Sequence, residues 1–121
     1  MPNQADYFDL SQALYSTLEQ AYEDVDEMRQ LGVEKAKKRG NYRAALKTRI
    51  LALRADKSIP ATLVPKVAEG SKDVNQAFIE AEIAEVEWEA ARETVMLRKR
   101  EADIIREQIN REWYTPKEVN V

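Results

Sequence analysis

Apolar and small residues recur at coiled-coil spacing, alternately three and four positions apart, over residues 73–113. Arg98 is the one residue that interrupts this row. Because the stretch contains neither Gly nor Pro, we expect one amphipathic helix of about forty residues, roughly 60 Å long. The row consists of Val74, Ala77, Ala81, Ala84, Trp88, Ala91, Val95, Ala102, Ile105 and Ile109.

A second apolar row lies beside the first on the same predicted helix. It widens the apolar face beyond a simple two-helix seam, so we expect the helix to need partner helices along most of its length. This second row consists of Ile79, Ile83, Val86, Ala90, Leu97 and Ile104.

The first half of the chain carries a helical stripe with two candidate interruptions, Gly32 and the pair Gly40 and Asn41. Gly adopts the left-handed conformation that ends many helices, and Asn can cap the helix that follows. The stripe before and after the interruptions consists of Tyr7, Leu10, Leu14, Leu18, Ala21, Val25 and Met28, and of Tyr42, Ala45, Leu46, Ile50 and Leu53.

Residues 58–71 are the one clear connection, because Pro60, Pro65 and Gly70 prevent a long helix there. The connection is unusually apolar for a loop. Its apolar side chains either close the end of a helical bundle or form an exposed docking tip, since loops often carry function. They belong to Ile59, Leu63, Val64 and Val67.

These patterns predict an all-α fold, an elongated antiparallel helical hairpin of coiled-coil type in a single domain over residues 1–121. The alternative is a three-helix bundle that turns back at Gly40 and Asn41, which would leave half of the second arm without an intrachain partner. We expect self-association, most simply a homodimer that forms a four-helix bundle. The expected parts are a first arm at about 9–57, kinked or broken between Gly32 and Asn41, a turn at 58–71, a second arm at about 72–113 and a loose tail at 115–121.

Charged residues occur in blocks along the chain, whose net charge is −3. Residues 34–57 hold nine bases and two acids, whereas residues 72–97 hold seven acids and two bases. Folding about a turn near residue 64 sets these blocks side by side, and their attraction favours this register over a slipped one. We expect Arg98 to pair with an acid of the first arm, with Glu27 as the candidate.

The chain contains no Cys and no His, which excludes disulfides and thiolate nucleophiles and removes the commonest general base and metal ligand. Glu82, Glu85 and Glu89 have a helical spacing that could hold Mg²⁺, as in all-α nucleotide pyrophosphohydrolases, and Glu23, Asp24 and Glu27 are the alternative set. No convincing second pair of acids follows the first set on a neighbouring helix. We therefore expect a protein that is not an enzyme and holds no metal or cofactor.

The amino-terminal residues lack the basic and apolar segments of a signal peptide. No apolar run approaches the length of about eighteen residues that a membrane span needs. We expect a soluble, cytoplasmic protein without a membrane partner.

The strongest basic feature comprises Lys35, Lys37, Lys38, Arg39 and Arg43. Clustered Lys and Arg release counterions from nucleic acid, so these residues are a candidate nucleic-acid-binding site. The competing interpretation is that they balance acids of the opposite helix. The acidic net charge and the scarcity of nearby aromatic residues weaken the case for a platform that stacks single-stranded bases.

The two tryptophans are candidate anchors for another protein. Trp88 falls among alanines of the seam, where its ring packs either within the hairpin or against a partner. Trp113 is expected near Leu14 and Tyr15, as an aromatic plug at the open end of the hairpin.

Residues 97–113 read LRKREADIIREQINREW. This run resembles small helical proteins of phages and prophages that often lie beside single-strand-binding and recombination genes, and the similarity covers roughly residues 42–114. The resemblance implies an accessory role in a phage or mobile element, and it carries over no catalytic residue.

Together these observations predict a non-enzymatic module that binds, and could inhibit, another protein, such as a recombination, replication or host-defence component. The candidate partner-binding residues are Ile59, Leu63, Val64, Trp88 and Trp113. The alternative is a nucleic-acid-binding accessory factor that uses the basic segment at residues 35–57.

Overall fold

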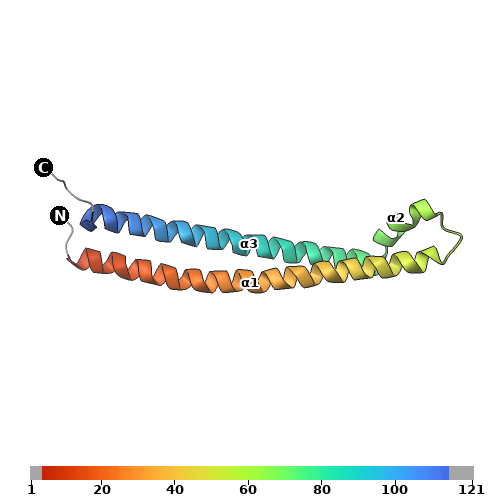
Figure 1. Cartoon of the computed structure of the whole chain (residues 1–121), viewed down its shortest axis with the longest axis horizontal. Coiled ribbons are helices and arrows are strands. Elements are labelled where there is room, and N and C mark those ends of the chain that lie inside the picture. The colour runs from red at the N-terminus through yellow and green to blue at the C-terminus, as the bar shows by residue number, and fades with distance from the viewer. Residues whose placement is uncertain (1–3, 115–121) are drawn as a thin grey trace. The chain divides into compact units, whose positions relative to one another are not determined.

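The computed structural model describes residues 4–114, all of which lie in helices or in the short connections between them. Two long helices, α1 (Gln4–Arg54) and α3 (Lys72–Ile109), account for most of the chain (Figure 1). Between them lie a 3₁₀ turn (Ala61–Leu63) and the short helix α2 (Val64–Glu69), and a π-helical turn (Asn110–Tyr114) follows α3. The predicted all-α helical hairpin is confirmed.

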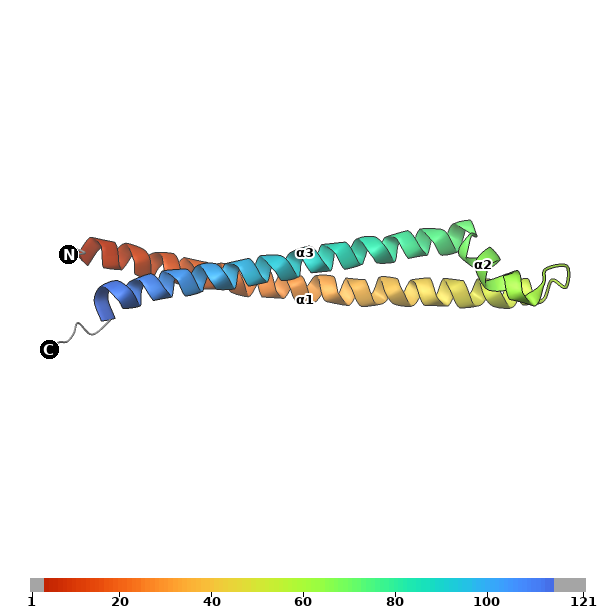
Figure 2. The same ribbon diagram turned by 90° about the horizontal axis from the view of Figure 1, so that it is seen from above.

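Two compact units make up the fold. Over the described residues one unit, which we call the terminal unit, combines 4–28 with 91–114, and the other, the turn unit, is Arg29–Ala90. Within each unit a segment of α1 lies beside a segment of α3 that runs in the opposite direction (Figures 1 and 2). Each unit therefore has its own seam between the two helices.

The first arm is one continuous helix, and the predicted break between Gly32 and Asn41 is wrong. The alternative three-helix bundle is wrong for the same reason, because α1 does not turn back at Gly40. An interior glycine costs a helix about 1 kcal/mol relative to alanine, which packing against α3 outweighs. Gly32 also has a packing role, since a Cβ atom there would lie 3.2 Å from Trp88 Nε1.

The predicted seam of α3 is confirmed, because each of its apolar and small residues is buried or half-buried. Arg98 also lies at a seam position, where its side chain is half-buried. The second row is different. It does not widen the packed face, because all six of its residues are exposed on the outer side of α3. One apolar row of α3 packs against α1, and the other faces solvent.

The seam of α1 follows a strict heptad spacing that includes polar residues. Thr17 and Asp24 occupy buried seam positions, whereas Leu18, which the apolar stripe had selected, is exposed. In the turn unit the half-buried seam positions of α1 include Lys35, Lys38 and Arg49. The side chains between the helices are therefore more polar than the apolar stripe predicted.

The connection between α1 and α3 contains a 3₁₀ turn and a short helix and is not a simple loop. Pro65 lies in the first turn of α2, where its missing amide donor costs nothing. Ser58 donates from its backbone amide and its hydroxyl to Asp56 Oδ1, at 3.0 Å and 2.6 Å, which holds the chain as it leaves α1. At the start of α3, the carbonyl of Ser71 accepts a hydrogen bond from Asn75 N at 2.9 Å. Ser71 thus lies at the amino-terminal end of α3, and its hydroxyl donates to Ala68 O at 2.6 Å.

The pairing of the two helices differs slightly from the expected register. Residues joined across the seam, such as Arg49 with Asp73 and Lys38 with Glu80, have midpoints near residue 60 rather than 64. The 3₁₀ turn and α2 both lie after that midpoint. The connection is therefore asymmetric, and it shifts every cross-helix partner from the position that a central turn would give.

Candidate functional surfaces

The most buried polar cluster in the terminal unit joins α1 and α3 through Asp24 and Arg98. Asp24 is only 7% exposed, and its Oδ2 accepts a hydrogen bond from Arg98 Nε at 3.0 Å. Gln20 donates to the other carboxylate oxygen at 3.1 Å. Glu101 accepts hydrogen bonds from Arg98 Nη1 and from Thr17 Oγ1, both at 3.3 Å. The cluster ties the two helices together at one register.

Burial raises the pKa of Asp24, but the hydrogen bonds from Arg98 and Gln20 and the positive charge of Arg98 together outweigh that effect. The pKa of Asp24 therefore lies below its ordinary value. The predicted partner of Arg98, Glu27, is exposed. Because Asp24 lies on the seam and Glu27 does not, Arg98 reaches Asp24 instead, and the predicted pairing is wrong.

Trp113 packs against the first turns of α1. Its ring and that of Tyr7 meet edge to face, with their centroids 5.2 Å apart and an angle of 76° between the ring planes. The expected neighbour Tyr15 is exposed and does not take part in this packing. The aromatic pair thus forms nearer the end of α1 than predicted, and Trp113 is half-buried there.

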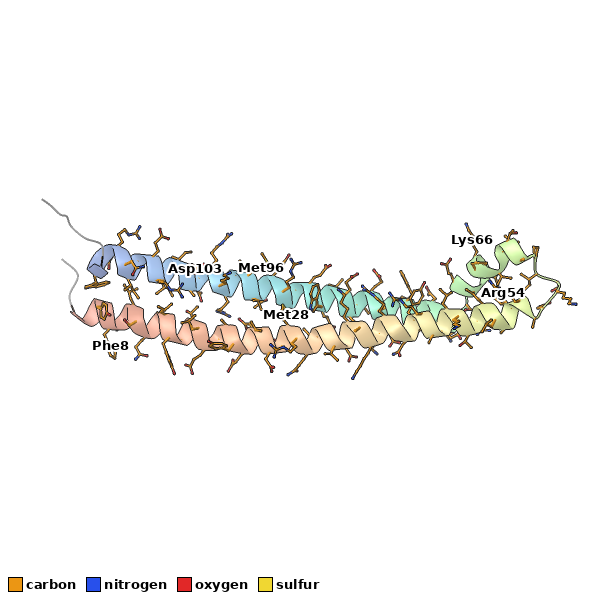
Figure 3. All side chains as sticks on the ribbon, in the orientation of Figure 1. Phe8, Met28, Arg54, Lys66, Met96 and Asp103 are labelled. Atoms are coloured by element: carbon orange, nitrogen blue, oxygen red, sulfur yellow. The ribbon has the colours of Figure 1, made fainter. Side chains whose placement is uncertain are left out.

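Large apolar side chains remain exposed in the terminal unit. On α1, Phe8, Tyr15 and Tyr22 recur every seven residues, and Tyr22 is 78% exposed. On α3, a shallow groove of about 240 Å³ is lined by Glu93, Met96, Leu97 and Arg100. Phe8 and Met96 mark these outward sides of their helices in Figure 3.

Trp88 packs inside the turn unit. Its ring approaches the backbone of Gly32, and the Nζ atom of Lys35 lies 4.0 Å from the ring centroid, as in a cation–π contact. Lys35 also lies 3.6 Å from Glu85 Oε1. The candidate anchor Trp88 is therefore engaged by side chains of its own chain.

Three of the five candidate nucleic-acid-binding residues are neutralised within the turn unit. Lys38 Nζ lies 3.0 Å from Glu80, and Arg39 Nη2 lies 3.1 Å from Glu85 Oε1, which Lys35 shares. The hydrogen bond and charge of Glu80 raise the pKa of Lys38, and Lys38 lowers the pKa of Glu80 in turn.

The other two candidates, Lys37 and Arg43, are exposed and have no ion pair among residues 4–114. The basic segment therefore has two parts. One balances the acids of α3, and the other faces solvent.

The apolar residues of the connection also fall into a buried group and an exposed group. Val64 of α2 is 2% exposed and belongs to the core together with Ala68. Leu63 is 49% exposed, and Ile59 is intermediate. Of the three candidate docking residues in the connection, Leu63 presents the most side-chain surface, whereas Val64 closes the end of the turn unit.

Two further surfaces lie on the outer sides of the turn unit. On α1, a groove of about 330 Å³ is lined by Arg43, Leu46, Lys47, Ile50, Leu51 and Arg54. On α3, Ile79, Ile83 and Val86 are exposed on the side opposite the seam.

No group of three or more acidic side chains in the described part of the chain is placed so that it could hold a metal ion. Glu85, one of the three spaced glutamates, instead accepts contacts from Lys35 and Arg39. Over residues 4–114, no helix combines the length and the apolar character needed to cross a membrane.

Comparisons of the chain with protein-family models, with curated proteins and with solved structures found no match. The resemblance to phage accessory proteins therefore stays a prediction.

Sequence reasoning missed the buried pair of Thr17 and Asp24 and the exposed aromatic residues of α1. Both features have a simple sequence signal. Heptad spacing that starts from Tyr7 and Leu10 leads to Thr17 and Asp24, and an interval of seven leads from Phe8 to Tyr15 and Tyr22. A search restricted to apolar positions passes over the first signal.

Proposed function

We propose that this protein is a non-enzymatic module that binds another protein. The observation that supports the proposal most directly is the second apolar row of α3, which is left in solvent. In the terminal unit that row presents Leu97, 66% exposed, and Ile104, with Met96 beside them. Contiguous exposed apolar side chains rimmed by charge are typical of interaction surfaces.

The shape and charge of this surface favour a helical or extended apolar segment as its ligand. The groove at Met96 and Leu97 is flanked by one acid, Glu93, and one base, Arg100. An amphipathic helix laid along α3 would cover residues at heptad spacing, as in helix-in-groove recognition. A partner that carries one charge of each sign beside its apolar face would complement both flanks.

The biological role that we propose is that of an accessory factor of a phage or mobile element. This part of the proposal rests on the resemblance of residues 97–113 to small phage proteins. Its partner would then be a recombination or replication component, or a host-defence protein that the module inhibits.

A capture experiment in a lysate of the host tests the proposal. The full-length protein is cross-linked to its partners, and the captured proteins are compared with those held by the variant Leu97→Asp. Gln12→Asp is the matched control, because it adds the same charge at an exposed position of α1. We expect a partner that is lost with Leu97→Asp and kept with Gln12→Asp. Identical capture by all three proteins would refute the proposed surface.

A second candidate function, nucleic-acid binding, is supported by the solvent-facing bases Lys37 and Arg43. The ion pairs of Lys35, Lys38 and Arg39 leave a smaller basic surface than the sequence suggested, which makes this candidate the weaker one. It predicts binding to short DNA or RNA at low salt that weakens as salt is raised and when Lys37 and Arg43 are changed to Glu. Absence of a mobility shift at low salt would remove it.

A further inference from the structure

In the turn unit the exposed row of α3 has a distinctive charge pattern on both of its flanks. Ile79, Ile83 and Val86 form the row, and Ile83 is 53% exposed. If a second heptad is assigned to this outer face of α3, separate from the heptad of the seam, these three residues take its core positions. The four positions that flank them are all glutamates, namely Glu80, Glu82, Glu87 and Glu89. The surface is thus an apolar strip between two acidic edges.

This pattern determines which kind of helix could cover the strip. In a coiled coil the flanking positions of one helix lie beside those of its partner, and like charges there disfavour pairing. Two copies of the strip would set glutamates against glutamates in either orientation. Among the residues that the structure describes, Glu80 is the one of the four that pairs with a base, Lys38. A suitable partner therefore has an apolar centre and basic edges.

The same unit carries such a surface on its other helix. The outer groove of α1 has an apolar floor of Leu46, Ile50 and Leu51, and Leu51 is 56% exposed. Its remaining lining residues are all bases: Arg43, Lys47 and Arg54. Across residues 4–114, none of these three bases lies within ion-pair distance of an acid. The groove is accordingly the charge complement of the strip on α3.

The two surfaces are not used by each other within one chain. The α3 strip lies opposite the seam that packs on α1, and Ile83 of the strip and Leu51 of the groove are each more than half exposed, whereas Leu46 and Ile50 are half-buried. Apart from the pair of Glu80 with Lys38, the charges that hold α1 to α3 within the unit belong to residues outside the two surfaces, among them Arg49 with Asp73 and Arg39 with Glu85. The basic groove and the acidic strip are what remains after that internal pairing.

We infer that the acidic strip of α3 binds the basic groove of α1 of a second copy of this chain. Such a contact joins unlike surfaces. After one contact has formed, the pair of copies still has one free groove and one free strip, which either meet each other in a reciprocal two-fold dimer or bind further copies to give a ring or an open filament. This contact lies in the turn unit and is separate from the surface at Leu97.

Light scattering on the full-length protein, coupled to size-exclusion chromatography, tests the inference. We expect the mass to rise above that of one chain with concentration and to fall when salt is raised from about 0.05 M to about 0.5 M, because exposed charge pairs are screened. A single-chain mass at every concentration in low salt would overturn the inference. It would leave the proposed function standing, because that rests on Leu97.

Two variants establish which surfaces meet. Ile83→Lys places a base in the strip, and Leu51→Glu places an acid in the groove. Both sites are more than half exposed, so the helices are expected to persist, which circular dichroism checks. Each variant alone should associate about tenfold more weakly than the unchanged protein. Mixed in equal amounts they should associate again, because the intact groove of the first meets the intact strip of the second.

Other outcomes would overturn the pairing of groove with strip. If the strip paired with itself, Leu51→Glu would associate normally and the mixture would restore nothing. If the groove instead took nucleic acid, a short DNA would bind the unchanged protein and not Leu51→Glu, while no self-association occurred. Gln12→Glu serves as the control, since it adds an acid at an exposed position of α1 in the terminal unit, outside both surfaces, and it should associate like the unchanged protein.

Discussion

The turn unit and the terminal unit are built from the same two helices, yet they fill the seam between α1 and α3 differently. In the turn unit α1 contributes the long side chains of Lys35, Lys38 and Arg49, whose charged ends reach glutamate or aspartate at the edge of the seam. The facing positions of α3 are mostly alanine, which leaves room for aliphatic stems. In the terminal unit a carboxylate, Asp24, is itself buried and held by Arg98.

This difference shows that one helical pairing can place its charges in two physically distinct ways. Charges at the edge are partly exposed, so salt screens them and each pair contributes little alone. A buried carboxylate is screened much less, and it is tolerated only in the register that brings its partner. We therefore expect the terminal unit to fix the register of the two helices and the turn unit to respond more to salt.

The largest expected effect concerns the closed end of the turn unit. Val64→Asp would place a charge in the core, and we expect the free energy of unfolding to fall by about 4 kcal/mol. Leu63→Asp, one residue earlier and half exposed, should change it by under about 0.5 kcal/mol. Amide hydrogen exchange, resolved by peptide, measures both variants. Equal loss of protection in the two would contradict the division of the connection into core and surface.

A smaller effect is expected from the buried carboxylate of the terminal unit. Asp24→Asn keeps the shape but removes the charge that faces Arg98, and we expect a loss of about 1.5 kcal/mol. Glu80→Gln makes the same change at a partly exposed pair of the turn unit and should cost less. Urea titration compares the two variants. A greater loss for Glu80→Gln would reverse the comparison between the units.

The two interior glycines of α1 give a matched pair within one unit. A Cβ atom at Gly40 meets nothing within 4 Å, so Gly40→Ala should raise the free energy of unfolding by about 0.8 kcal/mol. At Gly32 the same gain in helix propensity is offset by contact with Trp88, so Gly32→Ala should give no gain or a loss. Thermal unfolding distinguishes the two. Stabilisation by both would mean that the Trp88 ring yields readily.

The smallest effect is the dependence of stability on pH. The folded-state pKa of Asp24 is depressed, so its contribution is present above the unfolded value of about 3.9 and is lost as pH falls through the folded value. Asp73 behaves alike in the turn unit, because its hydrogen bond from Arg49 lowers its pKa. Acid titration of unfolding should therefore show a loss below about pH 4 in both units. In the Asp24→Asn variant, the loss of stability at low pH should become smaller for peptides of the terminal unit and stay unchanged for peptides of the turn unit.

Much of the fold follows from local pattern in the sequence. The row from Val74 to Ile109 determined the seam of α3, including the half-buried places of Trp88 and Arg98. Pro60, Pro65 and Gly70 located the connection. These features are predictable because helix periodicity and the missing amide of proline act within a few residues of the chain.

Other features depended on distant residues. Gly32 could have ended a helix, but the Trp88 ring beside it gives the glycine a packing role within a continuous helix. Asp24 lies on a seam position that an apolar stripe skips, and it is stable there only because Arg98 donates to it. Leu97 and Ile83 belong to an apolar row that the sequence placed beside the seam and the structure leaves in solvent.

The sequence by itself therefore determined two long helices, their antiparallel pairing and the place of the connection. Only the tertiary structure decided the register, the partners of the charged residues and which of two apolar rows remains exposed. The physical reason is the distance along the chain over which each effect acts. Helical periodicity is a property of neighbouring residues, whereas burial of Asp24 or exposure of Ile83 depends on which side chains the other helix brings alongside.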